Sequence, residues 1–454
     1  MTFATNGAAE GPHTPRATLQ QKIAYGLGTV GIATLSVPVS FLMLYYLTQI
    51  SGLSPALAGA AVGLPKIWDA LVDPLLGGWV DRLALRMKRR TLINITSATA
   101  YVLSFIFLFS LPQVRSSGLL VVISTLLLIS FSVSQTGFSV SQYALAGEMT
   151  SNSVELSGLL SLANVFGQLV STAGVALTPI IVSEAGGGKT GYTYMAIALA
   201  AVASGAMTIF TLSTRAVPVK VEHHETETFP LLTAIRATGT NRPFYLLIAF
   251  LICQGIGTSI LFAFLPFASQ FVLHGSSSAF SILVVLLRVA GLSGMVATPW
   301  LVGRFGDTAC LRWSNWLTVA AFILMLGSSY SSLWTTWMSI ALVGAAAGVN
   351  YVVLQTTVLE VSQMGLKGGI VIATGFYFGI MVAATKLCDS AGGFAAGELL
   401  NVIGFVSGSG HQSLQTVQGL RFGYTVAPAT LALIGALILH ILKPFRPHAE
   451  GVVG

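Results

Sequence analysis

Twelve apolar stretches, each near the length needed to cross a lipid bilayer, recur along this chain of 454 residues. They fall at residues 24–50, 56–83, 92–111, 118–146, 156–184, 191–213, 244–273, 278–303, 312–328, 333–360, 369–405 and 419–442. Charged residues make up only 8% of the chain, whereas a soluble domain usually carries about a quarter. A soluble core cannot account for this pattern. The sequence therefore predicts an all-α membrane protein with twelve transmembrane helices.

Positive charge is distributed unevenly between the segments that connect these stretches. The two terminal segments and the loops on the same side of the membrane hold 16 of the 22 Lys and Arg residues, against three on the other side and three inside the spans. By the positive-inside rule, both termini are cytoplasmic. The net charge of +7 is therefore a topology signal and not a nucleic-acid surface. We expect a multi-pass protein of the cell inner membrane.

One long polar interruption divides the twelve stretches into six plus six, and the two sets correspond. Pro74 and Gly78 lie where the second span meets the cytoplasm, and Pro299 and Gly303 lie in the same places 225 residues later. A duplicated bundle with corresponding breaks is typical of secondary transporters. The predicted organisation is an N-terminal six-helix bundle, a cytoplasmic linker loop and a C-terminal six-helix bundle, at residues 1–213, 214–243 and 244–454.

Two aspartates, Asp69 and Asp73, lie one helical turn apart inside the second apolar stretch. At positions i and i+4 they share one helix face, roughly 6 Å apart, close enough to coordinate one cation or to share one proton. Ionisable residues inside a membrane helix are rare and usually functional. The two acids could instead be structural counter-ions to Lys66 and Lys386. Because two acids exceed what one lysine requires, we interpret them as a cation site.

The motif W-D-A-x-x-D-P at residues 68–74 resembles the glycoside-pentoside-hexuronide:cation symporter family of the major facilitator superfamily. The resemblance runs nearly end to end, with further matches at residues 25–28, 143–150, 241–244 and 386. It implies a two-bundle major facilitator fold, with the coupling Na⁺ or H⁺ bound by Asp69 and Asp73. In this family the fourth span adds side-chain ligands, which assigns Thr136 and Ser139 to the cation site.

The charged groups that hold sugars in the melibiose carrier of this family have no counterparts here. Its Lys-Asp pair in the first span is Ile32-Ala33 in this chain, its fourth-span aspartate aligns with Ser139, and no Lys or Arg occurs from 116 to 188. A cavity of hydroxyls, amides and aromatics should disfavour simple disaccharides and suit a less polar or an anionic solute. The candidate solute-binding residues are Lys386, Tyr143, Asn164 and Tyr25.

Other charged residues fit gating or structural roles. They are Lys66, Asp81, Arg82, Glu148, Glu155, Arg288 and Asp389. The Asp-Arg pair after the second span is expected to stabilise a cytoplasmic closure. Glu148 and Glu155 flank the short turn between the fourth and fifth spans and form either gating pairs or solvated charge. Arg288 either snorkels to the outer surface or binds an anion, and Lys386 with Asp389 is either a self-compensated pair or part of coupling.

These features predict a secondary active transporter and not an enzyme. The expected activity is H⁺- or Na⁺-coupled symport of a small organic solute by alternating access. A carrier of lysolipids or other amphiphiles and a proton-coupled exporter are the alternatives. Replacement of the fourth-span acid by Ser139 removes one negative charge, which favours H⁺ or weak Na⁺ binding. We expect a monomer in the bilayer with no cofactor or metal other than the coupling ion.

Overall fold

The computed structural model describes residues 18–112, 116–150, 153–217, 242–272, 277–326, 333–365 and 374–441. Regular structure in these ranges is entirely helical, so the predicted all-α fold is confirmed. The α-helices are α1 (Leu19–Tyr45), α2 (Pro55–Met87), α3 (Thr91–Leu108), α4 (Ser117–Met149), α5 (Ser153–Glu184), α6 (Gly188–Thr214), α8 (Arg242–Phe267), α9 (Ser277–Phe305), α10 (Asp307–Leu326), α11 (Leu333–Gly365), α12 (Thr374–Val402) and α13 (Leu414–Ile441). Two π-helical segments, η1 (Tyr46–Ile50) and η2 (Ala268–Val272), extend α1 and α8.

Local sequence explains where several helices begin and end. The Thr18 side chain accepts a hydrogen bond from the Gln21 backbone and Gln21 returns one, which caps the start of α1. Pro55 occupies the first turn of α2, where a missing backbone N–H costs nothing. Lys88 after α2 and Gly306 after α9 both have positive φ, at 56° and 80°. These residues follow the second helix of each group of six, so corresponding corners of the chain are built alike.

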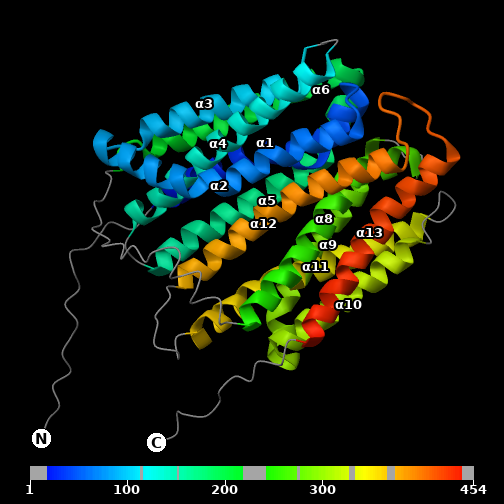
Figure 1. Cartoon of the computed structure of the whole chain (residues 1–454). Helices are drawn as coiled ribbons and strands as arrows, with labels where there is room; N and C mark the ends of the chain where they lie inside the picture. The colour runs from blue at the N-terminus through cyan, green and yellow to red at the C-terminus, as the bar shows by residue number, and fades with distance from the viewer. Residues whose placement is uncertain are drawn as a thin grey trace, which may run out of the picture.

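The helices pack in two groups, the N-terminal half (α1 to α6) and the C-terminal half (α8 to α13), which lie side by side in Figure 1. In the first, α1 packs on α5 and α6, and α4 packs on α2 and α3. In the second, α8 packs on α12 and α13, and α11 packs on α9 and α10. The predicted linker falls mostly at residues 218–241, outside the described ranges. The exact bounds of the two bundles therefore stay a prediction.

Ten of the described helices are long and apolar enough to cross a membrane. The helix α12, which carries Lys386, falls outside this set, and in α2, which carries Asp69, most side chains from 70 to 78 lie outside the described residues. Both helices place ionisable side chains inside an otherwise apolar bundle, where such side chains need partners. These two helices pack against each other, and they belong to opposite halves. The helices that carry Asp69 and Lys386 thus meet at the junction between the halves.

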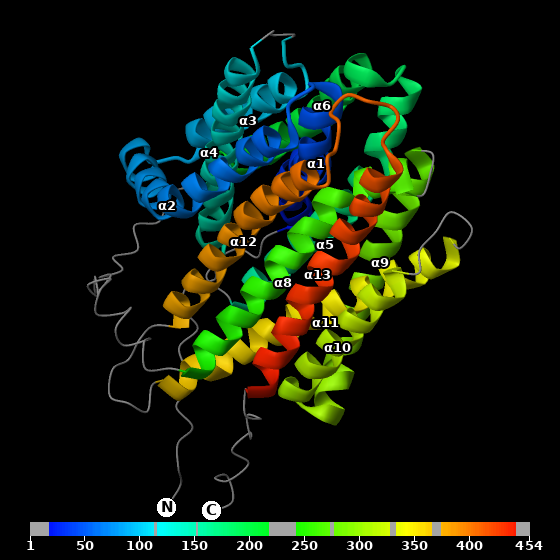
Figure 2. The same ribbon diagram turned by 45° about the vertical axis from the view of Figure 1, so that its right-hand side comes forward.

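The two halves contact each other toward one end of the bundle, which we call the closed end. It holds residues 51–54, 185–187 and 403–413. Hydrogen bonds between the halves include Ser390 to the Gly63 carbonyl, Ser407 to the Leu53 carbonyl, Ser281 to the Ala176 carbonyl and Tyr45 to Gln270. All lie between the middle of the helices and the closed end. Figures 1 and 2 show the opposite ends of α2 and α11 well apart.

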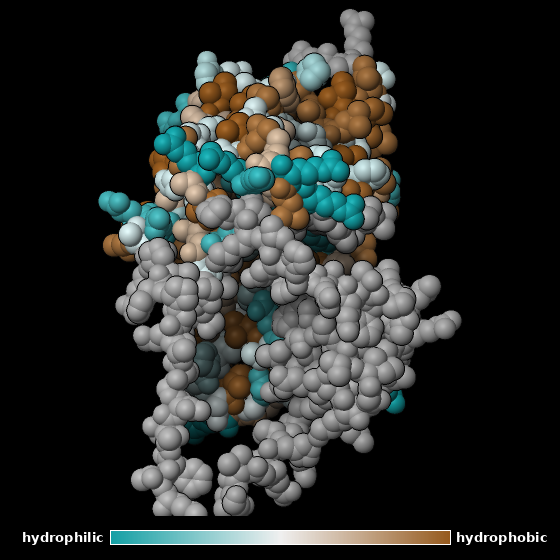
Figure 3. All heavy atoms as spheres, turned by 90° about the vertical axis from the view of Figure 1, so that its left-hand side faces the viewer, coloured by the Kyte–Doolittle hydropathy of each residue, from teal (hydrophilic) through white to brown (hydrophobic). Residues whose placement is uncertain are grey.

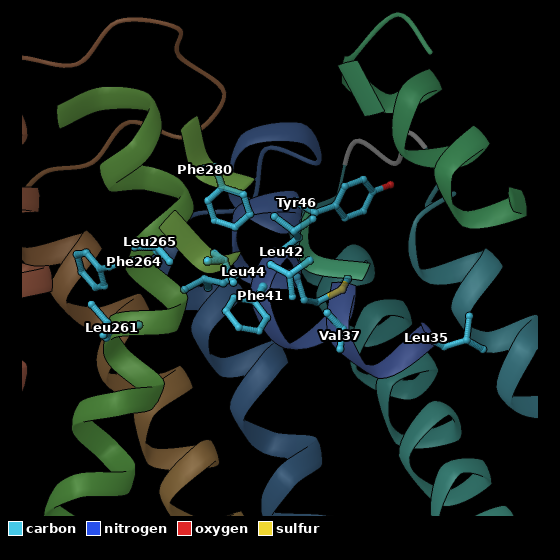
Figure 4. Close-up of a cluster of buried hydrophobic side chains, with 14 of the residues drawn as sticks. Leu35, Val37, Phe41, Leu42, Leu44, Tyr46, Leu261, Phe264, Leu265 and Phe280 are labelled. Atoms are coloured by element: carbon cyan, nitrogen blue, oxygen red, sulfur yellow. The ribbon is translucent and has the colours of Figure 1, made fainter. Parts of the chain in front are cut away.

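Close helix packing forms part of the closed end. A Cβ added to Gly59 of α2 would lie 2.7 Å from the Cα of Gly397 of α12, so glycine is needed for this approach. Beside it, aromatic rings of α1 and α8 meet, with the Phe41 and Phe262 centroids 4.7 Å apart. Figure 4 shows Phe41 of α1 in the same apolar cluster as Leu261 of α8. The halves are therefore joined here by backbone and apolar contacts.

Candidate functional site

A cavity of about 270 Å³ lies between the two halves, below the closed end. Helices α1, α2 and α4 of the N-terminal half and α8, α9 and α12 of the C-terminal half line it. Its polar and charged lining residues are Ser36, Ser40, Lys66, Ser132, Gln135, Ser259, Arg288 and Asp389. Figure 3 shows one face of the molecule, on which hydrophilic and hydrophobic residues are mixed. A small central chamber shared by both halves is where a secondary transporter binds its solute.

Asp69 is buried beside this cavity, with 7% of its surface exposed. Its carboxylate accepts a hydrogen bond from Ser132 of α4, and the charges of Lys66 and Lys386 act on it. A buried carboxylate needs such hydrogen bonds and positive partners to stay ionised. Because Ser132 also lines the cavity, one hydroxyl contacts both the carboxylate and the chamber.

The partners of Asp69 come from both halves of the protein. Lys66 lies one turn earlier on α2, and Lys386 lies on α12. A change in the charge of Asp69 therefore alters the attraction between two helices that belong to different halves. The side chain of Asp73 lies outside the described residues, so the joint cation site of the two aspartates stays a prediction.

The hydroxyl that contacts Asp69 is one that the sequence interpretation missed. Thr136 and Ser139, the expected ligands, lie half-buried on α4. Ser132 precedes them at the i, i+4 and i+7 spacing that places all three on one helix face. This periodicity could have predicted Ser132 from the sequence, because the helix face that carries Thr136 and Ser139 continues for two turns to Ser132.

The predicted solute-binding residues are dispersed. Lys386 acts on Asp69, but it does not line the chamber among the described residues. Tyr25 is buried, and its hydroxyl donates to the Gln142 carbonyl at 3.2 Å, which joins α1 to α4. Tyr143 is 64% exposed, Asn164 is exposed too, and neither belongs to the lining. Solute contact by these four residues stays a prediction.

Arg288 lies at the chamber and not at the membrane surface. Its guanidinium carbon is 5.4 Å from the ring centre of Phe41 and 5.8 Å from that of Phe262. Of the two roles considered for it, this position leaves the anion-binding one open and does not support snorkelling. Asp389 also lines the chamber, and its carboxylate accepts a hydrogen bond from Ser259 at 2.9 Å.

A buried ion pair lies near the other end of the N-terminal half. The Nε of Arg90 donates to an Oε1 of Glu148 at 3.0 Å, and both side chains are 7% exposed. Glu148 is therefore paired and not solvated. The sequence did not predict Arg90 as its partner, because no spacing pattern connects the two positions. Arg82 is exposed. The side chains of Asp81 and Glu155 lie outside the described residues, so the closures expected there stay predictions.

Comparison with known proteins identifies relatives of the chain. "Uncharacterized symporter YnaJ" of Bacillus subtilis (strain 168) is 26% identical over 245 residues, which cover 53% of this chain and 52% of that protein. The isoprimeverose transporter of Lactiplantibacillus pentosus is 22% identical over 296 residues, which cover 64% of this chain and 60% of that protein. The matches thus span about half to three fifths of these relatives.

Solved structures share the fold. A bacterial homologue of the human lysosomal transporter Spinster, in an inward-facing and unoccupied conformation, has a TM-score of 0.69 at 15% identity and covers 93% of this chain and 95% of its own. A D-xylose-proton symporter has a TM-score of 0.66 at 14% identity, with coverages of 94% and 98%. These likenesses confirm the predicted major facilitator fold.

A family model described as MFS/sugar transport protein matches residues 24–443, nearly the whole chain. The match confirms the resemblance found in the sequence and agrees with the prediction of a transporter and not an enzyme. The chain belongs to the MFS/sugar transport protein family.

Proposed function

We propose that this protein is a cation-coupled symporter that carries a small organic solute across the membrane by alternating access. One observation carries the proposal: Ser132 contacts both the buried carboxylate of Asp69 and the chamber between the halves. A shared side chain is the simplest way for an occupied cation site to affect solute binding. The names of the relatives, which include a symporter and a sugar transporter, support the same activity.

Coupling follows from the charges around Asp69. With no cation bound, Asp69 attracts Lys66 of its own helix and Lys386 of the opposite half. A bound Na⁺ or H⁺ neutralises Asp69 and thereby weakens its attraction for the two lysines and the attraction between α2 and α12. The two halves can then rock about the loaded chamber. In this scheme Asp73 completes the cation site, with Thr136 and Ser139 nearby on α4.

The coupling ion is proposed to be H⁺ or a weakly bound Na⁺. Among the described residues, no group of three or more His, Cys, Asp and Glu is placed to hold a metal ion. A proton needs only one carboxylate, whereas Na⁺ binds better when more carboxylate oxygens surround it. We propose no cofactor beyond this ion.

Topology and assembly complete the proposal. We propose that both termini lie in the cytoplasm of a cell inner membrane and that the closed end faces outward, which the distribution of Lys and Arg supports. The inward-facing state of the related solved structure supports this orientation. We propose that the protein acts as a monomer in the bilayer. The chamber volume of about 270 Å³ lies below the range of about 300–1,000 Å³ for drug-sized ligands, which favours a small solute over a lysolipid.

The experiment uses the purified full-length protein in liposomes with an imposed Na⁺ or H⁺ gradient and a panel of radiolabelled small solutes. We expect accumulation above equilibrium for at least one solute under one gradient. Asp69→Asn should abolish this accumulation but retain the melting temperature and solute exchange without a gradient. Glu184→Gln, a neutralised acid at the closed-end terminus of α5, is the control. Accumulation unchanged in Asp69→Asn would contradict the proposal.

A further inference from the structure

Arg288 occupies a position that the proposed mechanism leaves unused. It lies on α9, lines the chamber, and has its Nε atom buried without a hydrogen-bond partner among the described residues. A buried guanidinium N–H left without a partner costs free energy, because its lost hydration is not replaced. Such a group in a ligand chamber is therefore a candidate for contact with the ligand.

The surroundings of Arg288 hold its plane in place. Phe41 of α1 and Phe262 of α8 contact it through cation–π interactions at 5.4 and 5.8 Å, so it is held by both halves of the protein. Aromatic contact stabilises the charge and leaves the N–H edge of the guanidinium for a hydrogen-bond acceptor. A planar two-oxygen acceptor such as a carboxylate fits that edge with two parallel hydrogen bonds.

The charge of the chamber favours a single negative charge on the solute. Its charged lining residues are the cations Lys66 and Arg288 and the anion Asp389. Asp389 is hydrogen-bonded by Ser259, and no ion pair joins it to Arg288 in the described structure. With Asp69 and Lys386 beside the wall included, the described groups carry three positive and two negative charges while Asp69 is ionised. One negative charge on the solute therefore balances them, whereas a doubly charged phosphate would leave an excess.

The remaining polar wall is organised for hydroxyl groups. Gln135 donates a hydrogen bond to Ser36 at 3.2 Å, and both residues line the chamber. Ser40, also on α1, adds a further hydroxyl to the lining. Short uncharged donors and acceptors of this kind match a polar solute that carries hydroxyls besides its charged group.

We propose that Arg288 is a solute-binding residue that holds the carboxylate of a small, singly charged polar solute. This inference rests on the proposed transport function and specifies the class of its substrate. Arg288 thereby separates anionic solutes from neutral ones of the same size. Binding of the carboxylate also gives the buried Nε a partner, so the loaded chamber is more fully hydrogen-bonded than the unloaded one.

The test compares matched pairs of solutes that differ only in oxidation to a carboxylate. Glucose is paired with glucuronate, and galactose with galacturonate, in thermal-shift and uptake measurements on the full-length protein in detergent and in liposomes. The wild-type protein should bind at least one carboxylate at least about tenfold more tightly than its neutral partner. Arg288→Gln should remove that preference, and Arg288→Lys should keep part of it, because lysine retains the charge without the planar fork.

The matched control is Arg304→Gln, the same substitution on the same helix. Arg304 is exposed and stacks on Trp300 and Phe305 away from the chamber, so the preference should survive. If Arg288→Gln does not fold, the wild-type comparison still decides: equal or weaker binding of every carboxylate overturns the proposal. A preference that persists in folded Arg288→Gln also overturns it. Gradient-driven uptake that ignores solute charge refutes only this inference, whereas no gradient-driven uptake at all refutes the proposed function.

Discussion

The hydroxyl of Ser132 on α4 donates a hydrogen bond to the carboxylate of Asp69 on α2, and it does so at the wall of the central chamber. A hydrogen bond to a charged group typically contributes about 1.5–3 kcal/mol. The contact therefore contributes enough to influence the charge state of Asp69. A solute that contacts Ser132 can therefore influence the Asp69 carboxylate through this one side chain.

Replacement of Ser132 tests this link. Ser132→Ala should reduce the apparent affinity for the coupling cation by about tenfold, because one oxygen ligand near Asp69 is lost. The dependence of uptake rate on Na⁺ concentration, or on pH, measures the effect. Ser124→Ala is the control, because the Ser124 hydroxyl donates a hydrogen bond to the Val121 carbonyl of its own helix and Ser124 does not line the chamber. Unchanged cation dependence in Ser132→Ala would show that the hydroxyl plays no part in coupling.

The glycine contact at the closed end should control the conformational equilibrium. Gly59→Ala places a Cβ against the Gly397 backbone, and such overpacking typically costs about 1–3 kcal/mol. The variant should shift toward a state in which the closed end opens. In a background without native cysteines, alkylation of Ser407→Cys at that end should become several times faster.

The control for this shift is Gly205→Ala on α6. No atom lies within 4 Å of a Cβ added at Gly205, so the substitution should not disturb the packing. Alkylation of Ser407→Cys in the Gly205→Ala variant should therefore be as fast as in the parent protein. Equal rates in Gly59→Ala and Gly205→Ala would mean that the glycine contact does not hold the halves together.

The Arg90–Glu148 pair should matter for stability more than for transport. Glu148→Gln leaves Arg90 buried without its charged partner, which typically costs about 3–5 kcal/mol. A lower melting temperature in detergent is the expected readout. The double variant Arg90→Met with Glu148→Leu should recover much of the loss, since apolar residues of similar size tolerate burial. The control is Arg82→Gln, at an exposed site. A melting temperature of Glu148→Gln equal to that of Arg82→Gln would show that the buried pair does not stabilise the protein.

Tyr25 offers a test of a residue that the sequence assigned to the solute. In the structure its hydroxyl joins α1 to the backbone of α4 at Gln142. Tyr25→Phe should therefore reduce stability by about 1 kcal/mol and leave solute affinity within about twofold of the parent. Thermal unfolding and equilibrium binding measure the two effects separately. A large loss of solute affinity at unchanged stability would restore Tyr25 to the binding site.

The sequence was informative wherever one helix carried the whole signal. Apolar length predicted the helices, and the i, i+4 spacing of Asp69 and Asp73 placed both acids on one face of α2. Charge within an apolar stretch also singled out Arg288, because a cation there requires a partner or a function. These inferences needed only local periodicity and the cost of burying charge.

Contacts between distant segments could not be predicted in the same way. Arg90 and Glu148 are 58 positions apart in the sequence, and Gly59 and Gly397, which are in contact, belong to different halves of the chain. No spacing rule connects such positions, since their meeting depends on how complete helices pack. Which hydroxyl of α4 lies at Asp69 likewise depends on the relative height of α2 and α4, which periodicity does not determine.

The way the closed end is sealed has a consequence for the speed of turnover. Among the described residues, no ion pair crosses between the halves there; glycine backbones, aromatic rings and single hydroxyls form the seal. Apart from Arg288, whose guanidinium lies over Phe41 and Phe262, separating these surfaces exposes no charge that must be rehydrated, so no ion pair has to be broken at each opening. Salt concentration then has little influence on how often the gate opens. Temperature and the match between the protein surface and the surrounding lipid have a much larger influence on this frequency.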